Sequence, residues 1–187
     1  MVKVGFIVEG DCERIVVESA NFTKFLSDCG QELVAPVIDA KGGGNLLPHN
    51  IDAFIQVLEM KAVSKIYVLT DLEEEVSADV VRDRISNAKV KTIFIAVKAL
   101  EAWFLADSQA MSNWLKQQYH EPYPEATLHK PYDRLKEIAK VTGVSGPGNK
   151  PAFAKKMIKH FDFSIVRAAQ HPQCPSAREL VDYFQGK

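Results

Sequence analysis

The chain has few cysteines, no excess of either charge and no long apolar run, and each shortage excludes a class of protein. Three cysteines among 187 residues form no C-x-x-C pair. Their number and spacing argue against a disulfide framework or a cysteine-based zinc site and indicate a reducing compartment. No apolar run approaches the roughly 20 residues that cross a bilayer. No signal-like segment precedes the first apolar run. We therefore expect a cytoplasmic protein that does not bind membranes.

Several catalytic motifs are also missing. The five histidines show neither H-x-x-x-H nor H-E-x-x-H spacing, and the chain contains no G-x-S-x-G. A zinc enzyme and a serine hydrolase of the usual kinds are therefore not indicated. The glycines at 42, 43 and 44 lack P-loop spacing, and no G-x-G-x-x-G follows the first strand.

Charge is balanced overall but unevenly distributed. The net charge of −1 excludes a uniformly basic nucleic-acid binder. From Lys130 onward, however, eleven Lys and Arg face five Asp and Glu, so this part carries +6 and the first 129 residues carry −7. This distribution fits metal ligands in the first part and a surface for a polyanion in the tail, although an ordinary helical surface would give the same count.

Apolar runs alternate with amphipathic stretches over the first hundred residues. Strands are predicted at 3–8, 33–38, 65–70 and 92–97, and helices at 12–27, 51–60 and 78–88. This alternation predicts an α/β fold with a parallel four-stranded sheet flanked by helices. A helix at 101–118 follows, and further helices are predicted at 133–141, 151–161, 165–169 and 176–184. We expect an α/β domain over 1–118 and a helical C-terminal subdomain over 119–187 that packs on it.

Acidic residues follow two of the predicted strands. Glu9 ends the first strand, and Asp71 and Glu73 follow the third. Ligands of open α/β sheets bind at the carboxyl ends of the strands, and grouped carboxylates repel one another unless a cation neutralises them. Carboxylate oxygens are the ligands that Mg²⁺ or Mn²⁺ prefers. The sequence therefore predicts a divalent-metal site, with Glu13 one helical turn beyond Glu9.

These residues resemble a known family. The run V-E-G-x-x-E at 8–13, followed by D-x-E at 71–73, resembles the toprim domain of topoisomerases, primases, recombination-repair proteins and overcoming-lysogenization-defect nucleases. The usual second motif is D-x-D, so Glu73 is a departure that keeps the charge and lengthens the side chain. L-E-A-W-F-L-A-D at 100–107 and C-P-S-A-R-E-L at 174–180 resemble a toprim branch that is often encoded beside an ATPase in phage-defence gene pairs.

The resemblance implies a toprim-like, Rossmann-like fold and a role for each matching residue. Glu9 would be the catalytic acid or base and a metal ligand, and Asp71 and Glu73 would hold magnesium. Glu13 would belong to the second half of a two-metal site, and Glu101 would complete the cluster or simply begin a helix. Nuclease-type toprims also use a lysine on the phosphate, for which the candidates are Lys150, Lys155 and Lys156 in N-K-P-A-F-A-K-K.

The resulting hypothesis is a magnesium- or manganese-dependent nuclease that cleaves the phosphodiester bonds of DNA or RNA. One alternative is a non-catalytic toprim-fold effector or sensor subunit that works on a partner ATPase. Another is a nucleotide-binding α/β protein that uses the glycines at 42–44 to hold a phosphate. If the first hypothesis holds, that loop lies near the site and contacts the substrate backbone; otherwise it is a connector.

Overall fold

The computed structural model describes all 187 residues, which divide into two compact units, Met1–Ile95 and Ala96–Lys187. The division falls at the end of the last strand, whereas the sequence pattern places it at residue 118. No helix in either unit is long and apolar enough to cross a membrane.

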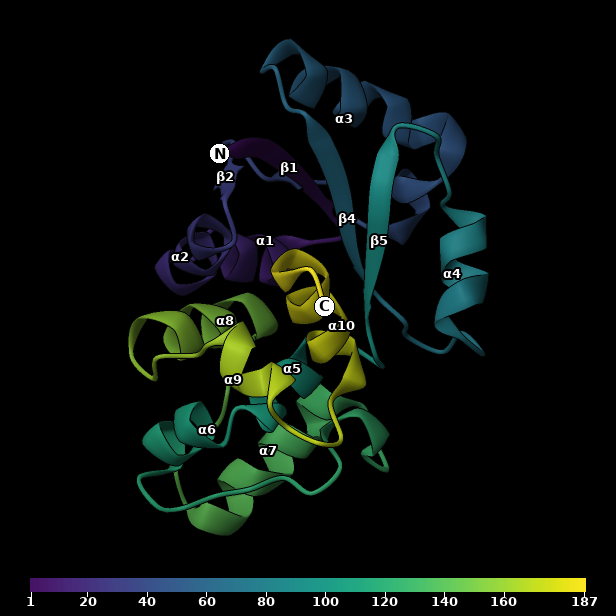
Figure 1. Ribbon diagram of the computed structural model, residues 1–187. Helices are drawn as coiled ribbons and strands as arrows, with labels where there is room; N and C mark the ends of the chain where they lie inside the picture. The colour runs from purple at the N-terminus through teal and green to yellow at the C-terminus, as the bar shows by residue number, and fades with distance from the viewer. The chain divides into compact units, whose positions relative to one another are not determined.

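The first unit is an α/β structure with a parallel sheet, as predicted. Its strands are β1 (Val2–Val8), β2 (Gln31–Leu33), β3 (Ile38–Asp39), β4 (Lys65–Asp71) and β5 (Val90–Ala96). The order is β2-β1-β4-β5, and β3 pairs with β1 beyond the end of β2. Helices α1 (Asp11–Val17) and α2 (Ala20–Asp28) lie on one side of the sheet, and α3 (Pro48–Met60) and α4 (Ala78–Arg84) on the other (Figure 1). A short 3-10 helix, η1 (Gly43–Leu46), precedes α3.

The two faces of the sheet bury different side chains. One face is aromatic: Phe6 of β1 contacts Phe22 of α2 and Tyr67 of β4, and Tyr67 contacts Phe94 of β5. The other face is aliphatic, and strand side chains pack there with α3 and α4 in one cluster (Ile7, Ala40, Leu46, Ile51, Ile55, Leu58, Ile66, Val68, Val81, Ile85, Ile93, Ile95). Successive side chains of a strand point to opposite faces of the sheet, and both faces are buried here. The sequences of β1 and β4 are therefore continuous hydrophobic runs.

Three predicted elements are interrupted in the structure. The strand expected at 33–38 is two short strands, and Pro36, which has no N–H to donate to the ladder, lies between them. The helix expected at 12–27 divides because Ser19 caps α2, accepting a hydrogen bond from the Phe22 amide at 3.2 Å. The helix expected at 101–118 divides at Asp107, which has a non-helical backbone and caps the second part.

The second unit is helical. It contains α5 (Glu101–Ala106), α6 (Ser108–Leu115), the 3-10 helix η2 (Pro124–Ala126), α7 (Pro131–Thr142), α8 (Lys150–Lys159), α9 (Ile165–Ala169) and α10 (Pro175–Gln185). Every residue of α5 is buried. Phe104 of α5 contacts Phe153 of α8 and Phe163, with ring centroids 6.0 and 4.8 Å apart. Apolar packing around α5 therefore forms the core of this unit.

Candidate functional site

The carboxylate of Glu9 lies at the carboxyl end of the sheet, beside Asp71. Strands β1 and β4 pair in parallel with Val8 opposite Leu69, and the Glu9 amide continues the ladder to the Leu69 carbonyl at 3.1 Å. Glu9 Oε2 accepts hydrogen bonds from the Thr70 hydroxyl and from the Asp71 amide, the latter at 3.2 Å. The Glu9 carboxylate thus lies at the backbone of Asp71, 62 positions further along the chain, and a cation shared by the two carboxylates stays a prediction.

The glycine-rich loop at 42–44 lies against the same carboxylate. The Gly42 amide donates a hydrogen bond to the Glu9 carbonyl at 2.8 Å. A Cβ atom at Gly43 would lie 3.4 Å from Glu9 Oε1, in van der Waals contact with it. Gly42 has a φ of 123°, a conformation that other residues rarely adopt. The glycines therefore keep the Oε1 side of Glu9 free of side chains, and the loop is near the candidate site as expected.

Glu13 is buried at the start of the helix that follows Glu9. It belongs to α1, is 5 % exposed and lies over Gly10, whose missing Cβ would be 3.4 Å from Glu13 Oε2. A carboxylate this far from water is not the solvated surface acid that a helix start usually carries. A role for Glu13 beside Glu9 in a metal site stays a prediction of the sequence.

A third acid follows a strand at this edge, and the sequence reading missed it. Asp39 ends β3, opposite Val8, and its largely buried carboxylate pairs with the Lys41 ammonium at 2.5 Å. Arg14 Nε lies 4.0 Å from Asp39, and its Nη2 pairs with Asp11 at 2.5 Å. The hydrogen bond from Arg14 lowers the pKa of Asp11. The available signal was the apolar run that ends at Asp39, which has the same pattern as the run before Glu9.

These pairs separate the acids of the first unit into two kinds. Asp39 and Asp11 are neutralised by Lys41 and Arg14 within the protein. Glu9 has no ion pair, and its carboxylate accepts only from neutral donors, a hydroxyl and an amide. The negative charge of Glu9 is therefore available to an external cation.

The D-x-E motif is only partly brought to the site. Asp71 is the last residue of β4 and is half-buried. Glu73 is exposed in the following turn and has a left-handed backbone with φ 53°. Nowhere in the structure do three or more Asp, Glu, His or Cys side chains form a group that could hold a metal ion. The three-carboxylate arrangement implied by the toprim resemblance is thus not assembled here.

Two of the other predicted site residues pair with each other in the second unit. The Lys150 ammonium lies 3.1 and 3.2 Å from the two carboxylate oxygens of Glu101, whose side chain is 3 % exposed. Lys150 also lies over the Tyr132 ring, 5.7 Å from its centroid. Lys155 is exposed on α8 and makes no ion pair. Of the candidate lysines, Lys150 is therefore held by a buried acid, and Lys155 is open to solvent.

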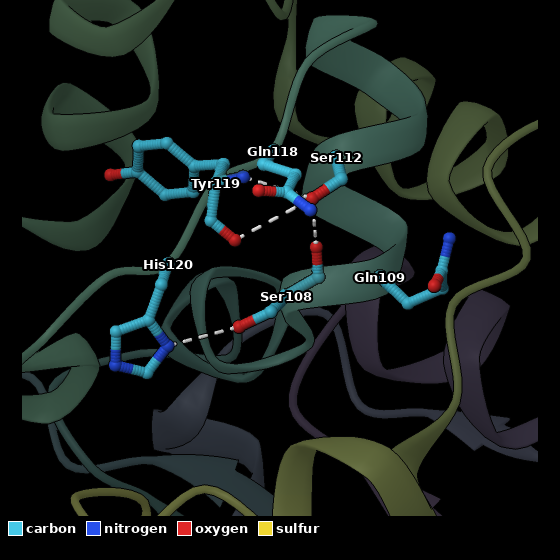
Figure 2. Close-up of a pocket in the computed structure, with 6 residues that line it drawn as sticks. All are labelled: Ser108, Gln109, Ser112, Gln118, Tyr119 and His120. Carbon is cyan, nitrogen blue, oxygen red and sulfur yellow. Dashed lines mark hydrogen bonds between the residues drawn. The ribbon is translucent and has the colours of Figure 1, made fainter.

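The second unit also contains an open pocket of about 730 Å³ (Figure 2). The Ser112 hydroxyl accepts from the Tyr119 amide at 3.0 Å, and His120 Nδ1 lies 3.1 Å from Ser108 Oγ. None of the residues predicted from the sequence lines this pocket, and its side chains are polar without an acid or a lysine (Ser108, Gln109, Ser112, Gln118, Tyr119, His120). Its lining suits neutral polar groups rather than a metal ion or a phosphate.

Comparison of the chain with protein-family models, with curated proteins and with solved structures gives no match.

Proposed function

We propose that this protein is a toprim-like phosphodiesterase that cleaves nucleic acid with the help of Mg²⁺ or Mn²⁺. The observation that carries the proposal is the environment of Glu9. Its carboxylate lies at the carboxyl end of a central parallel strand, has no cationic partner in the protein and faces a loop of glycines. This combination favours an external cation and leaves space for a substrate beside it.

The residues present suit magnesium. In proteins Mg²⁺ commonly takes only one or two carboxylates and completes its coordination with water and substrate phosphate, so a group of three acids is not required. Glu9 and Asp71 would hold the ion, and water and substrate phosphate would complete its shell. When bound, such an ion polarises the phosphoryl group and lowers the pKa of water.

The chain itself would orient the reacting groups. The Thr70 hydroxyl and the Asp71 amide fix Glu9 Oε2, so Oε1 is directed toward the loop at 42–44. Without side chains, Gly43 and Gly44 allow a phosphate to approach the backbone closely. In the second unit, Lys155 and Lys156 would supply positive charge for binding the polyanion.

A cleavage assay with matched variants tests the proposal. Labelled DNA and RNA are incubated with purified protein and Mg²⁺ or Mn²⁺, and Glu9→Gln and Asp71→Asn are compared with Glu18→Gln. Glu18 is an exposed acid at the end of α1, so its variant makes the same change in charge outside the site. We expect Glu9→Gln and Asp71→Asn to lower the rate by about 10²-fold or more, as loss of a group that stabilises the transition state does. Equal cleavage by all four proteins would reject the site.

One observation favours the alternative, a non-catalytic subunit of an ATPase-containing complex. The unit that holds Glu9 carries ten Lys and Arg against fifteen Asp and Glu, a net charge of −5 that repels a polyanion. Isolation with an ATPase from the native source, together with no cleavage by either the complex or the isolated chain, would support this alternative.

A further inference from the structure

Helix α8 carries an unusual set of charges. Its ten residues, Lys150–Lys159, include four lysines and no acid. Lys150 pairs with the buried Glu101. The other three, Lys155, Lys156 and Lys159, are exposed and make no ion pair. We call these three residues the α8 lysine face.

Most other helical cations of the protein have an acid within one turn. Lys24 pairs with Asp28 in α2 at 2.8 Å, and Arg82 pairs with Asp79 in α4 at 3.1 Å. In α7 the same holds for Lys136 and Arg134, which pair with Asp133 and Glu137. Charge pairing along the helix is thus the pattern in this chain, and α8 departs from it.

The departure costs stability within the isolated protein. Lys155 and Lys159 are four residues apart, so their side chains are neighbours on the helix surface and repel each other. The partial negative charge at the end of a helix favours Lys156 and Lys159, which lie in the last turn, but does not explain Lys155. A bound polyanion would relieve this repulsion for all three.

The packing of α8 indicates which polyanion fits. Its apolar side chains Phe153, Ala154 and Met157 are fully buried in the second unit, so the helix has no apolar face to insert into a lipid surface. What it presents to solvent is a compact row of point charges. The unit to which it belongs carries thirteen Lys and Arg against nine Asp and Glu, a net charge of +4. This surface suits a phosphate backbone in solution.

We propose that the α8 lysine face binds the sugar–phosphate backbone of nucleic acid independently of sequence. The choice of nucleic acid as the ligand rests on the proposed function. Lys155, Lys156 and Lys159 would each neutralise a phosphate and release condensed counterions, which makes binding strongly dependent on salt.

Fluorescence anisotropy with labelled single-stranded and duplex oligonucleotides, in the presence of a chelator, tests this inference without cleavage. The test variant replaces Lys155, Lys156 and Lys159 with Glu. The control variant makes the same change at Lys24, Lys89 and Lys187, which pair with acids elsewhere, so both variants have the same net charge. A second test variant with Gln at the three α8 positions removes the charge without reversing it.

We expect the α8 Glu variant to lose at least about tenfold in affinity near 100 mM salt, and the control less than about twofold. In the α8 Gln variant, the slope of log affinity against log salt should be smaller by about 2 for single strands and about 3 for duplexes, which corresponds to three lost phosphate contacts. An equal loss of affinity in the control variant would mean that net charge alone causes the loss, and would overturn the inference. Unchanged binding by folded α8 variants, or binding of the wild type to phosphatidylserine vesicles but not to oligonucleotides, would also overturn it.

The two proposals fail separately. If Glu9→Gln still cleaves, the catalytic site is wrong, but the binding result in chelator stands. If the α8 variants bind normally while Glu9→Gln is inactive, the lysine face is wrong and the catalytic site stands.

Discussion

Removing either partner of the ion pair between Asp107 and Arg167 should destabilise the helical unit by about 3–5 kcal/mol. Asp107 is fully buried, and four hydrogen bonds reach its carboxylate. Arg167 Nε and Nη2 donate at 2.9 and 3.0 Å, and the amides of Ser164 and Ala110 donate at 2.9 and 3.2 Å. The carboxylate thus caps α6, fixes the start of α9 and pairs with a guanidinium, which is a structural role.

Arg167→Ala would leave this buried carboxylate with only two amide donors. Removing one partner of a buried pair costs about 3–5 kcal/mol, because the remaining charge is uncompensated. Asp107→Ala should cost a similar amount, since the amides that it frees have no water to accept their hydrogen bonds. The substitution also removes a helix cap worth about 1 kcal/mol. The double variant should cost less than the sum of the two single variants by about 1–3 kcal/mol, as expected for residues in contact.

Urea unfolding followed by tryptophan fluorescence measures these costs. Both tryptophans, Trp103 and Trp114, belong to the second unit, so the signal reports the part of the protein that contains the pair. Asp162→Asn is the matched control, because Asp162 also pairs with Arg167 but is 66 % exposed, and its loss of charge should cost less than about 1 kcal/mol. Asn tolerates the left-handed backbone at this position, where φ is 58°. Additive single and double variants, or a cost for Arg167→Ala no larger than that of the control, would refute the reasoning.

Three further predictions concern buried groups of the second unit. Burial raises the pKa of Glu125, which accepts from the Ser176 hydroxyl and amide; Glu125→Gln, which keeps an acceptor without the charge, should therefore raise the melting temperature at neutral pH relative to Glu125→Ala. Burial, followed by the stacked ring of His120, lowers the pKa of His171, so the folded state resists protonation and its stability should fall as pH drops below about 6.5; calorimetry from pH 7 downward should show a smaller fall in His171→Asn. Burial raises the pKa of the Cys174 thiol, which is fully buried, so a thiol reagent should modify it only after unfolding, as a timed mass-spectrometric labelling experiment would show.

Continuous apolar runs made the sheet predictable, because strands buried on both faces have few polar interruptions. The same logic placed Glu9 beside Asp71, since two parallel neighbours end at the same edge. The boundaries of the helices depend on single residues, and the apolar pattern does not predict them. Ser19 and Asp107 each end one helix and cap the next within a stretch whose apolar spacing looks continuous, so the expected long helices divide there.

The sequence pattern could not predict that Glu101 pairs with Lys150. The two residues are 49 positions apart and lie on different helices, and nothing in their local spacing indicates contact. The toprim resemblance predicts both as site residues. Helix packing directs the lysine onto the buried acid, and the pair satisfies the charge of both.

The buried acids of the helical unit show why Glu9 is the strongest candidate for chemistry. Asp107 and Glu101 each face a basic side chain, and Glu121 pairs with Arg134 at 2.9 Å. Glu125 lacks a cation but is enclosed, and its raised pKa favours the neutral acid, which needs no counter-charge. Glu9 has neither an ion pair within the protein nor an enclosed environment. It is only half-buried, and its Oε1 oxygen faces glycines. A cation from the solvent would supply at Glu9 the neutralisation that the buried acids of the helical unit achieve internally.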